Sequence, residues 1–142
     1  MTKVMQLDDE WKAYLAAHIK WVEGWIAPGS EDKFKGPEGK VALLQLIIDS
    51  GEIPAEETVK LQCLGTYLGQ AIIEKTGWKW QVVEDEYGTD LAIQVPEKKA
   101  WIFPVTMISK RIEDGETVDV QDLFNNVIPM ALDVDAADID DA

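Results

Sequence analysis

Apolar side chains recur at helical spacing over three separate stretches in the first half of the chain. The first stretch follows Asp8 and Asp9, which can accept hydrogen bonds from the unpaired N–H groups of a first helical turn. Pro28 and Gly29 stop its pattern. We therefore predict a first helix between these signals. Its inward stripe would be formed by Trp11, Leu15, His18, Val22 and then Trp25 or Ile26.

The next two stretches predict a pair of longer helices. Residues 37–50 are apolar nearly all round and end at Gly51, so we expect this helix to be the central one. Residues 54–77 form the third helix. Gly65 and Gly69 lie on one face of it and leave room for another backbone to approach closely.

After Gly77 the period changes from 3.6 residues to two, which is typical of strands. Strands are expected at about residues 78–83, 91–95 and 101–103, joined by short turns. Consecutive strands with short connections predict an antiparallel meander. Pro104 ends the third strand because it has no N–H to donate to a neighbour.

Beyond the strands, the pattern predicts a short helix over residues 105–113 and one or two helical turns over residues 120–126, the latter capped by Asp119. The fold class is therefore α+β, with three N-terminal helices packed on a three-stranded antiparallel meander, followed by one or two short helices. We expect a single domain over residues 1–127 and an acidic C-terminal tail over residues 128–142.

The charge is strongly negative and unevenly spread. The 142 residues carry 27 acidic and 13 basic side chains, for a net charge of −14. Arg111 is the last basic residue, and the chain after it contains only acidic charges. Phosphate backbones and anionic membranes require Lys and Arg for binding, so we expect no nucleic-acid partner and no membrane partner. A basic or neutral protein surface is the expected partner, and the oligomeric state stays open.

Two further features concern location and redox chemistry. The first ten residues have no apolar core and no small-residue cleavage site, so we expect a cytoplasmic protein. The single cysteine, Cys63, excludes an intrachain disulfide and a multi-cysteine zinc site. Because Cys63 lies in an apolar helical stripe, we expect a buried, unreactive side chain.

Candidate functional side chains occur in two places: the acidic turn around Glu84-Asp85-Glu86 and the cation pair Lys110 and Arg111. Two nearby carboxylates in a turn can share a raised pKa or hold a divalent cation, but solvated turn acids are the simpler interpretation. No nucleophile elbow, phosphate loop or dinucleotide motif is present, so we expect no catalytic residue, metal or cofactor. The candidate binding residues are Glu84, Asp85, Glu86, Tyr87, Asp90, Lys110 and Arg111.

The chain contains a series of short motifs: Leu64-Gly65, Leu68-Gly69, Trp78-Lys79-Trp80, Glu84-Asp85-Glu86-Tyr87-Gly88 and the run from Phe103-Pro104 to Gly115. Together they resemble an uncharacterised bacterial family, domain of unknown function number 3806. The resemblance covers about residues 55–125. It implies a small bacterial α+β protein and identifies no catalytic residues.

Two functional hypotheses follow from these observations. The first is a non-catalytic acidic binding protein that binds a basic protein surface with charge steering and exposed aromatic side chains, as a toxin-neutralising protein of the immunity type would. The alternative is an enzyme or a divalent-metal-dependent domain that uses the Glu84-Asp85-Glu86 cluster. Convergence of these acids with Lys110 or Arg111 in a pocket would favour the alternative.

Overall fold

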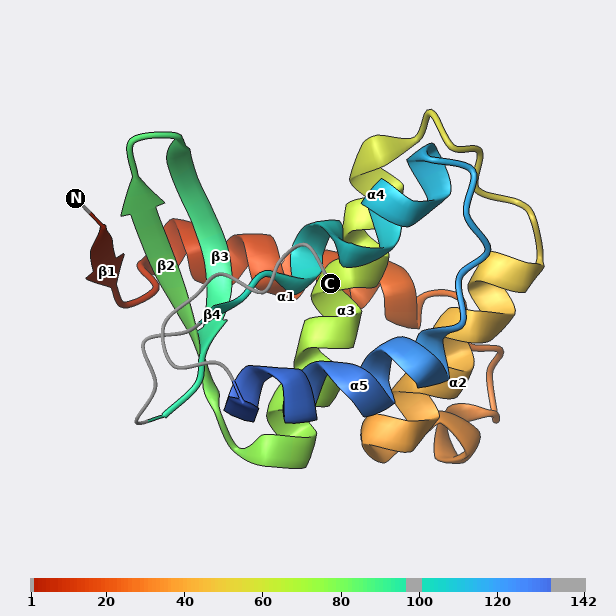
Figure 1. The fold of residues 1–142 in the computed structure, drawn as a ribbon. Coiled ribbons are helices and arrows are strands. Elements are labelled where there is room, and N and C mark those ends of the chain that lie inside the picture. The colour runs from red at the N-terminus through yellow and green to blue at the C-terminus, as the bar shows by residue number, and fades with distance from the viewer. Residues whose placement is uncertain (1, 97–100, 134–142) are drawn as a thin grey trace.

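The structure is a computed structural model that describes residues 2–96 and 101–133. A small sheet forms one end of the molecule, and a group of helices forms the other (Figure 1). Helix α1 (Asp9–Glu23) runs behind the sheet, and α3 (Thr58–Thr76) stands beside it. Helices α2 (Gly36–Asp49) and α5 (Val120–Asp133) pack against α3 from the far side. The α+β class is therefore confirmed.

The sheet has four antiparallel strands in the order β1-β2-β3-β4. Strands β2 (Lys79–Asp85), β3 (Gly88–Gln94) and β4 (Trp101–Ile102) form the predicted meander. Strand β1 (Lys3–Met5) was not predicted, because three residues are too short to show alternation. It pairs with the outer edge of β2 and so covers that edge.

The central helix is α3, and our expectation that the second helix is central was wrong. Helix α3 contacts α1, α2, α4 and α5, whereas Leu46 of α2 is 58% exposed. The reason lies in Gly65 and Gly69, which lack side chains and let neighbours approach α3 closely. Thus only part of the apolar surface of α2 is buried in the core.

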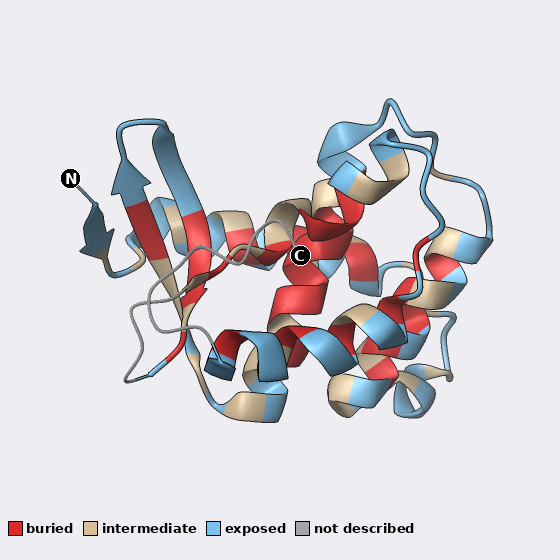
Figure 2. Cartoon of the chain, viewed as in Figure 1, coloured by how far each residue is buried: buried red, intermediate tan, exposed pale blue. Residues whose placement is uncertain are grey.

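Buried residues are red in Figure 2. Among the described residues, the buried hydrophobic ones form two clusters. The larger cluster joins α2, α3 and α5 to the lower end of the sheet through Ile93 and Ile102. The smaller one joins α1 to the upper sheet through Leu15, Val82 and Leu91. The six tryptophans are all half-buried, and five of them pack at the margins of these clusters.

Several element boundaries differ from the predicted ones. Asp8 caps α1 as expected, but the helix ends at Glu23, before Pro28. Helix α3 begins at Thr58 and ends at Thr76. Gly77 follows it in the left-handed conformation typical of a helix end. A single 3₁₀ turn, η1 (Glu31–Phe34), lies in the loop between α1 and α2.

The C-terminal part is more helical than predicted. The 3₁₀ turn η2 (Pro104–Thr106) leads into α4 (Met107–Glu113), and α5 continues to Asp133. Residues 128–133, which we assigned to the acidic tail, therefore belong to α5, where Ala131 is fully buried against the core. The rest of that tail, residues 134–142, lies outside the described residues.

Candidate functional site

The candidate site starts where strand β4 stops pairing with β3. Within the described residues, strand β4 pairs with β3 through Ile102 opposite Ile93 and Trp101 opposite Gln94 alone. If this register continued, Pro104 would lie opposite Leu91. Pro104 has no N–H to donate, so the ladder ends there and the chain turns into η2. A gap therefore opens between the upper half of β3 and η2.

Gly65 fixes the position of η2 on the other side of this gap. A Cβ atom at Gly65 would lie 2.2 Å from the carbonyl oxygen of Val105 and 2.5 Å from that of Pro104. The backbone of η2 thus rests directly on α3, which confirms the close approach predicted at this glycine. Gly69 plays the same part for the ring of Trp80, whose nearest atom would lie 2.3 Å from an added Cβ.

The gap forms a pocket of about 410 Å³. One wall is residues 89–91 of β3, and the opposite wall is formed by Phe103, Val105 and Thr106. Successive side chains of a strand point to opposite faces, so three consecutive lining residues mean that the strand presents its edge to the pocket. This wall therefore offers backbone N–H and C=O groups as well as side chains.

Helices complete the pocket with aromatic and polar side chains. Trp11 and Tyr14 come from α1, with ring centroids 5.3 Å apart in an edge-to-face arrangement, and Gln62 comes from α3. Burial raises the pKa of the Tyr14 phenol, and the nearby Cys63 and Asp90 add to this effect. The phenol stays protonated at neutral pH and can donate a hydrogen bond to a ligand.

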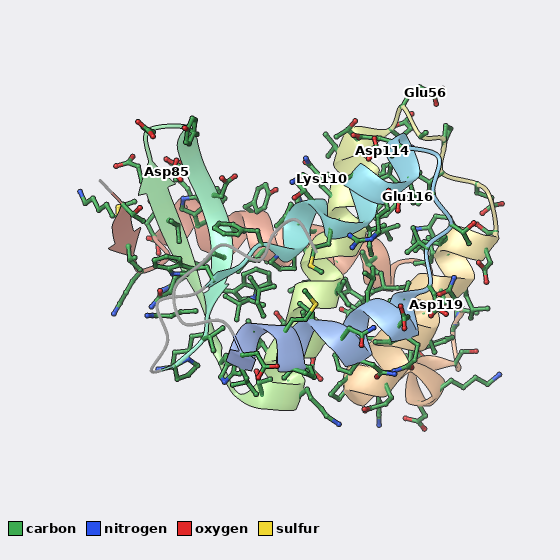
Figure 3. All side chains as sticks on the ribbon, viewed as in Figure 1. Glu56, Asp85, Lys110, Asp114, Glu116 and Asp119 are labelled. Carbon is green, nitrogen blue, oxygen red and sulfur yellow. The ribbon has the colours of Figure 1, made fainter. Side chains whose placement is uncertain are left out.

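Of the predicted candidates, the structure brings Asp90 and Lys110 to this pocket. In Figure 3, Lys110 lies on the α4 side of the pocket, between the β2–β3 hairpin and the end of α4. Arg111, its neighbour, does not line the pocket; its guanidinium donates to the carbonyl oxygen of Met107 over 2.8 Å. Only one of the two predicted cations therefore belongs to the site.

The other candidates lie at the tip of the β2–β3 hairpin. Glu84 accepts a hydrogen bond from the Thr89 hydroxyl over 3.3 Å, and Asp85 accepts one from the backbone N–H of Tyr87 over 2.8 Å. Glu86 and Tyr87 form the turn, where the Tyr87 side chain is 89% exposed. These residues do not converge with Lys110 in the pocket. Asp85 thus caps the turn, which fits the interpretation of this cluster as turn acids.

A second group of exposed acids, which do not line the pocket, lies near the start of α3 and the end of α4. Figure 3 shows Glu56, Asp114 and Glu116 together, beside the start of α3 and the end of α4. Within the described residues, no group of three or more histidine, cysteine, aspartate or glutamate side chains is arranged to hold a metal ion.

Two titratable side chains next to the pocket are buried in the contact between α1 and α3. His18 Nδ1 and the Thr66 hydroxyl oxygen are 2.8 Å apart, and burial lowers the pKa of the imidazole. The Cys63 thiol is buried, which confirms the predicted burial, and burial raises its pKa and so favours the less reactive thiol form.

Sequence reasoning missed Trp11, Tyr14 and Gln62 as pocket residues. Trp11 belongs to the amphipathic stripe predicted for the first helix, and Tyr14 lies three residues further on, beside that stripe. Such a stripe does not distinguish core positions from pocket positions. No pattern in the sequence marks Gln62 as a pocket residue.

Of the helices in the described ranges, none has both the length and the apolar composition needed to cross a membrane.

Fold and pocket together define a small α+β domain with a mixed polar and aromatic pocket at a strand edge. The sequence profile of the family described as "Domain of unknown function (DUF3806)" matches residues 40–124, and the chain belongs to this family. Comparison with curated proteins found no match.

A crystal structure of a protein from Bacteroides thetaiotaomicron VPI-5482 is similar in fold, with a TM-score of 0.78 and 15% sequence identity. The match covers 91% of this chain and 48% of that one, so the chain spans about half the length of that protein. At this identity the likeness shows the fold alone.

Proposed function

We propose that this protein is a non-catalytic binding protein that recognises a basic protein surface through its exposed carboxylates. The observation that carries the proposal is that the carboxylates of the two acidic regions are exposed to solvent. In the described part of the chain, the ion pairs Lys35–Asp32, Lys40–Glu74, Lys60–Glu57 and Lys75–Glu38 do not include Glu84, Asp85, Glu86, Asp114 or Glu116. With a net charge of −14, these carboxylates would steer a cationic partner toward the molecule.

Within this class, we propose an immunity-type role in the bacterial cytoplasm, in which the protein neutralises a basic toxin. The exposed Tyr87 at the hairpin tip supports a contact role, because amphipathic aromatic side chains dominate the energy of many interfaces. The alternative of a metal-dependent enzyme gains no support from the hairpin, where Asp85 is committed to capping the turn.

The test uses the purified product of the neighbouring gene as the binding partner. Binding is expected to weaken steeply as salt is raised, since exposed charges are screened. The Glu84→Gln/Glu86→Gln double variant should bind more weakly and associate more slowly than the wild type.

The matched control is the Glu31→Gln/Asp32→Asn double variant in η1, which changes the net charge by the same amount at a different place. If both double variants lose the same binding affinity, the effect depends on net charge and not on the position of the carboxylates. Absence of binding by the wild-type chain, or binding that is unchanged by salt, would refute the proposal.

A further inference from the structure

We infer that the pocket beside β3 receives an extended segment of the basic partner, which adds to the sheet as a further strand. The inference rests on the proposed function, because it names how the same partner is held. Strand β3 lines the pocket, so its backbone forms one wall of the space that the segment would enter.

The register of the hairpin determines which backbone groups face the pocket. A two-residue turn joins Asp85 to Gly88, so these residues form a hydrogen-bonded pair, and such pairs alternate with non-bonded pairs along the ladder. Thr89 and Leu91 fall in the non-bonded class relative to β2. Their N–H and C=O groups therefore point away from β2, toward the pocket.

Strand β4 does not reach these groups. Within the described part of the chain, it pairs with β3 only at Ile93 and Gln94, and no backbone hydrogen bond joins Thr89 or Leu91 to η2. An open strand edge is a ready template for another extended chain. Leu91 is also buried, and its polar backbone groups gain most from a partner that excludes water.

The pocket supplies a place for a side chain of the added strand. Trp11, Tyr14 and Phe103 present aromatic surface to the same space, with a volume of about 410 Å³. In an added strand, alternate side chains point into the pocket, so an apolar residue at every second position fits this wall.

Charge fixes the class of the occupant and its orientation. Glu84 and Glu86 are exposed at the hairpin end of the pocket, and Lys110 lines the pocket on the side of α4. A segment with Lys or Arg at its hairpin end would match the exposed carboxylates of Glu84 and Glu86. The occupant is thus a cationic, alternately apolar segment in extended conformation.

The experiment selects peptides from a random peptide library on the immobilised full chain and then measures binding of the enriched peptide in synthetic form. The blocking variant is Thr89→Pro, which removes the N–H that faces the pocket and leaves the ladder with β2 intact. Its matched control is Thr89→Val, which keeps that N–H and removes only the hydroxyl. We expect binding to Thr89→Val close to wild type and binding to Thr89→Pro weaker by about tenfold.

Amide hydrogen exchange of the wild-type chain gives a second readout that does not depend on the variants folding. The peptide should slow exchange at Thr89 and Leu91. The inference is overturned if no peptide is enriched, if Thr89→Pro binds as well as wild type, or if protection appears elsewhere. It is also overturned if sedimentation shows a dimer that Thr89→Pro dissociates, because the occupant is then a second copy of the chain.

The two proposals fail in different ways. If the basic partner binds Thr89→Pro normally but binds the Glu84→Gln/Glu86→Gln variant weakly, strand addition fails and the acidic binding function stands. If no basic protein binds but a neutral or acidic peptide occupies the strand edge, the proposed function fails. The inference that the occupant of the pocket is cationic then fails with it.

Discussion

His18 shows how one buried polar residue is accommodated in the contact between α1 and α3. The Thr66 hydroxyl donates to the carbonyl oxygen of Gln62 over 3.0 Å. Its oxygen therefore accepts from His18 Nδ1 at 2.8 Å, which leaves Nε2 of the neutral ring unprotonated. The Tyr14 ring lies 3.9 Å from the imidazole, centroid to centroid. The neutral imidazole thus suits this contact.

We predict that His18 makes the free energy of unfolding depend on pH below 6.5. The folded state lowers the pKa of His18 from the ordinary value of 6.5, because burial disfavours the charged ring. Between the folded pKa and 6.5, the unfolded chain binds more protons than the native one, so stability falls as the pH falls through this window. Above 6.5 the contribution is fully present.

Urea unfolding at a series of pH values, together with an NMR titration of the imidazole, measures this effect. The comparison is with His18→Gln, which cannot titrate. Identical pH slopes for the two proteins between 6.5 and the folded pKa of His18 would contradict the assignment.

At the scale of elements, the contact between α3 and η2 decides where the pocket lies. Gly65 brings the two backbones together, and Pro104 turns the chain away from β3 at the same point. The sequence predicted a close contact at the glycine pair. It did not predict which element makes the contact, because a motif on one helix does not specify the element that packs on it.

We predict that Gly65→Ala destabilises the fold by about 1–3 kcal/mol, in spite of the higher helix propensity of alanine. The new Cβ would lie 2.2 Å from the Val105 carbonyl oxygen, which is backbone and cannot rotate away. Chemical denaturation measures the loss.

The control for Gly65→Ala is Gly51→Ala, where a Cβ meets nothing within 4 Å and only the positive φ of +69° opposes it. A Gly65 variant that loses no more stability than the Gly51 variant would show that α3 and η2 are not in close contact.

A second junction between elements is made by Gln45 of α2. Its side-chain amide donates to the Val118 carbonyl oxygen over 3.1 Å and accepts from the Val120 N–H over 2.8 Å. This residue therefore satisfies backbone groups at the start of α5, beside the cap that Asp119 provides, as predicted, to the N–H of Asp122.

We predict that Gln45→Ala costs about 1–3 kcal/mol, since it leaves two partly buried backbone groups without their partner. Thermal and urea unfolding measure the cost. Gln121→Ala, which removes only an exposed bond to Asn125, should change stability by less than about 0.5 kcal/mol. Similar values for the two variants would argue against a structural role for Gln45.

At the scale of the whole molecule, the dominant property is a net charge of −14. We predict that salt stabilises the fold, because it screens the repulsion among carboxylates. Between about 0.01 M and about 0.15 M NaCl the screening length falls from about 30 Å to about 8 Å. The midpoint of thermal unfolding should rise by a few degrees, which corresponds to about 1 kcal/mol.

Scanning calorimetry at the two salt concentrations measures the shift, with sodium sulfate and sodium chloride compared at equal ionic strength. A midpoint that does not move, or that falls with salt, would show that attractive ion pairs such as Lys40–Glu74 outweigh the repulsion.

The sequence by itself determined the kinds of elements and much of their order. Helical and strand periods, the Asp8 and Asp119 caps, and the stops at Gly51, Gly77 and Pro104 are local signals, read within a few residues of where they act. The tertiary structure alone decided which helix is central, that residues 3–5 add a fourth strand, and that β3, η2 and α1 enclose a pocket. These outcomes depend on contacts between residues far apart in the chain, where shape and volume must match, and no local pattern records that match.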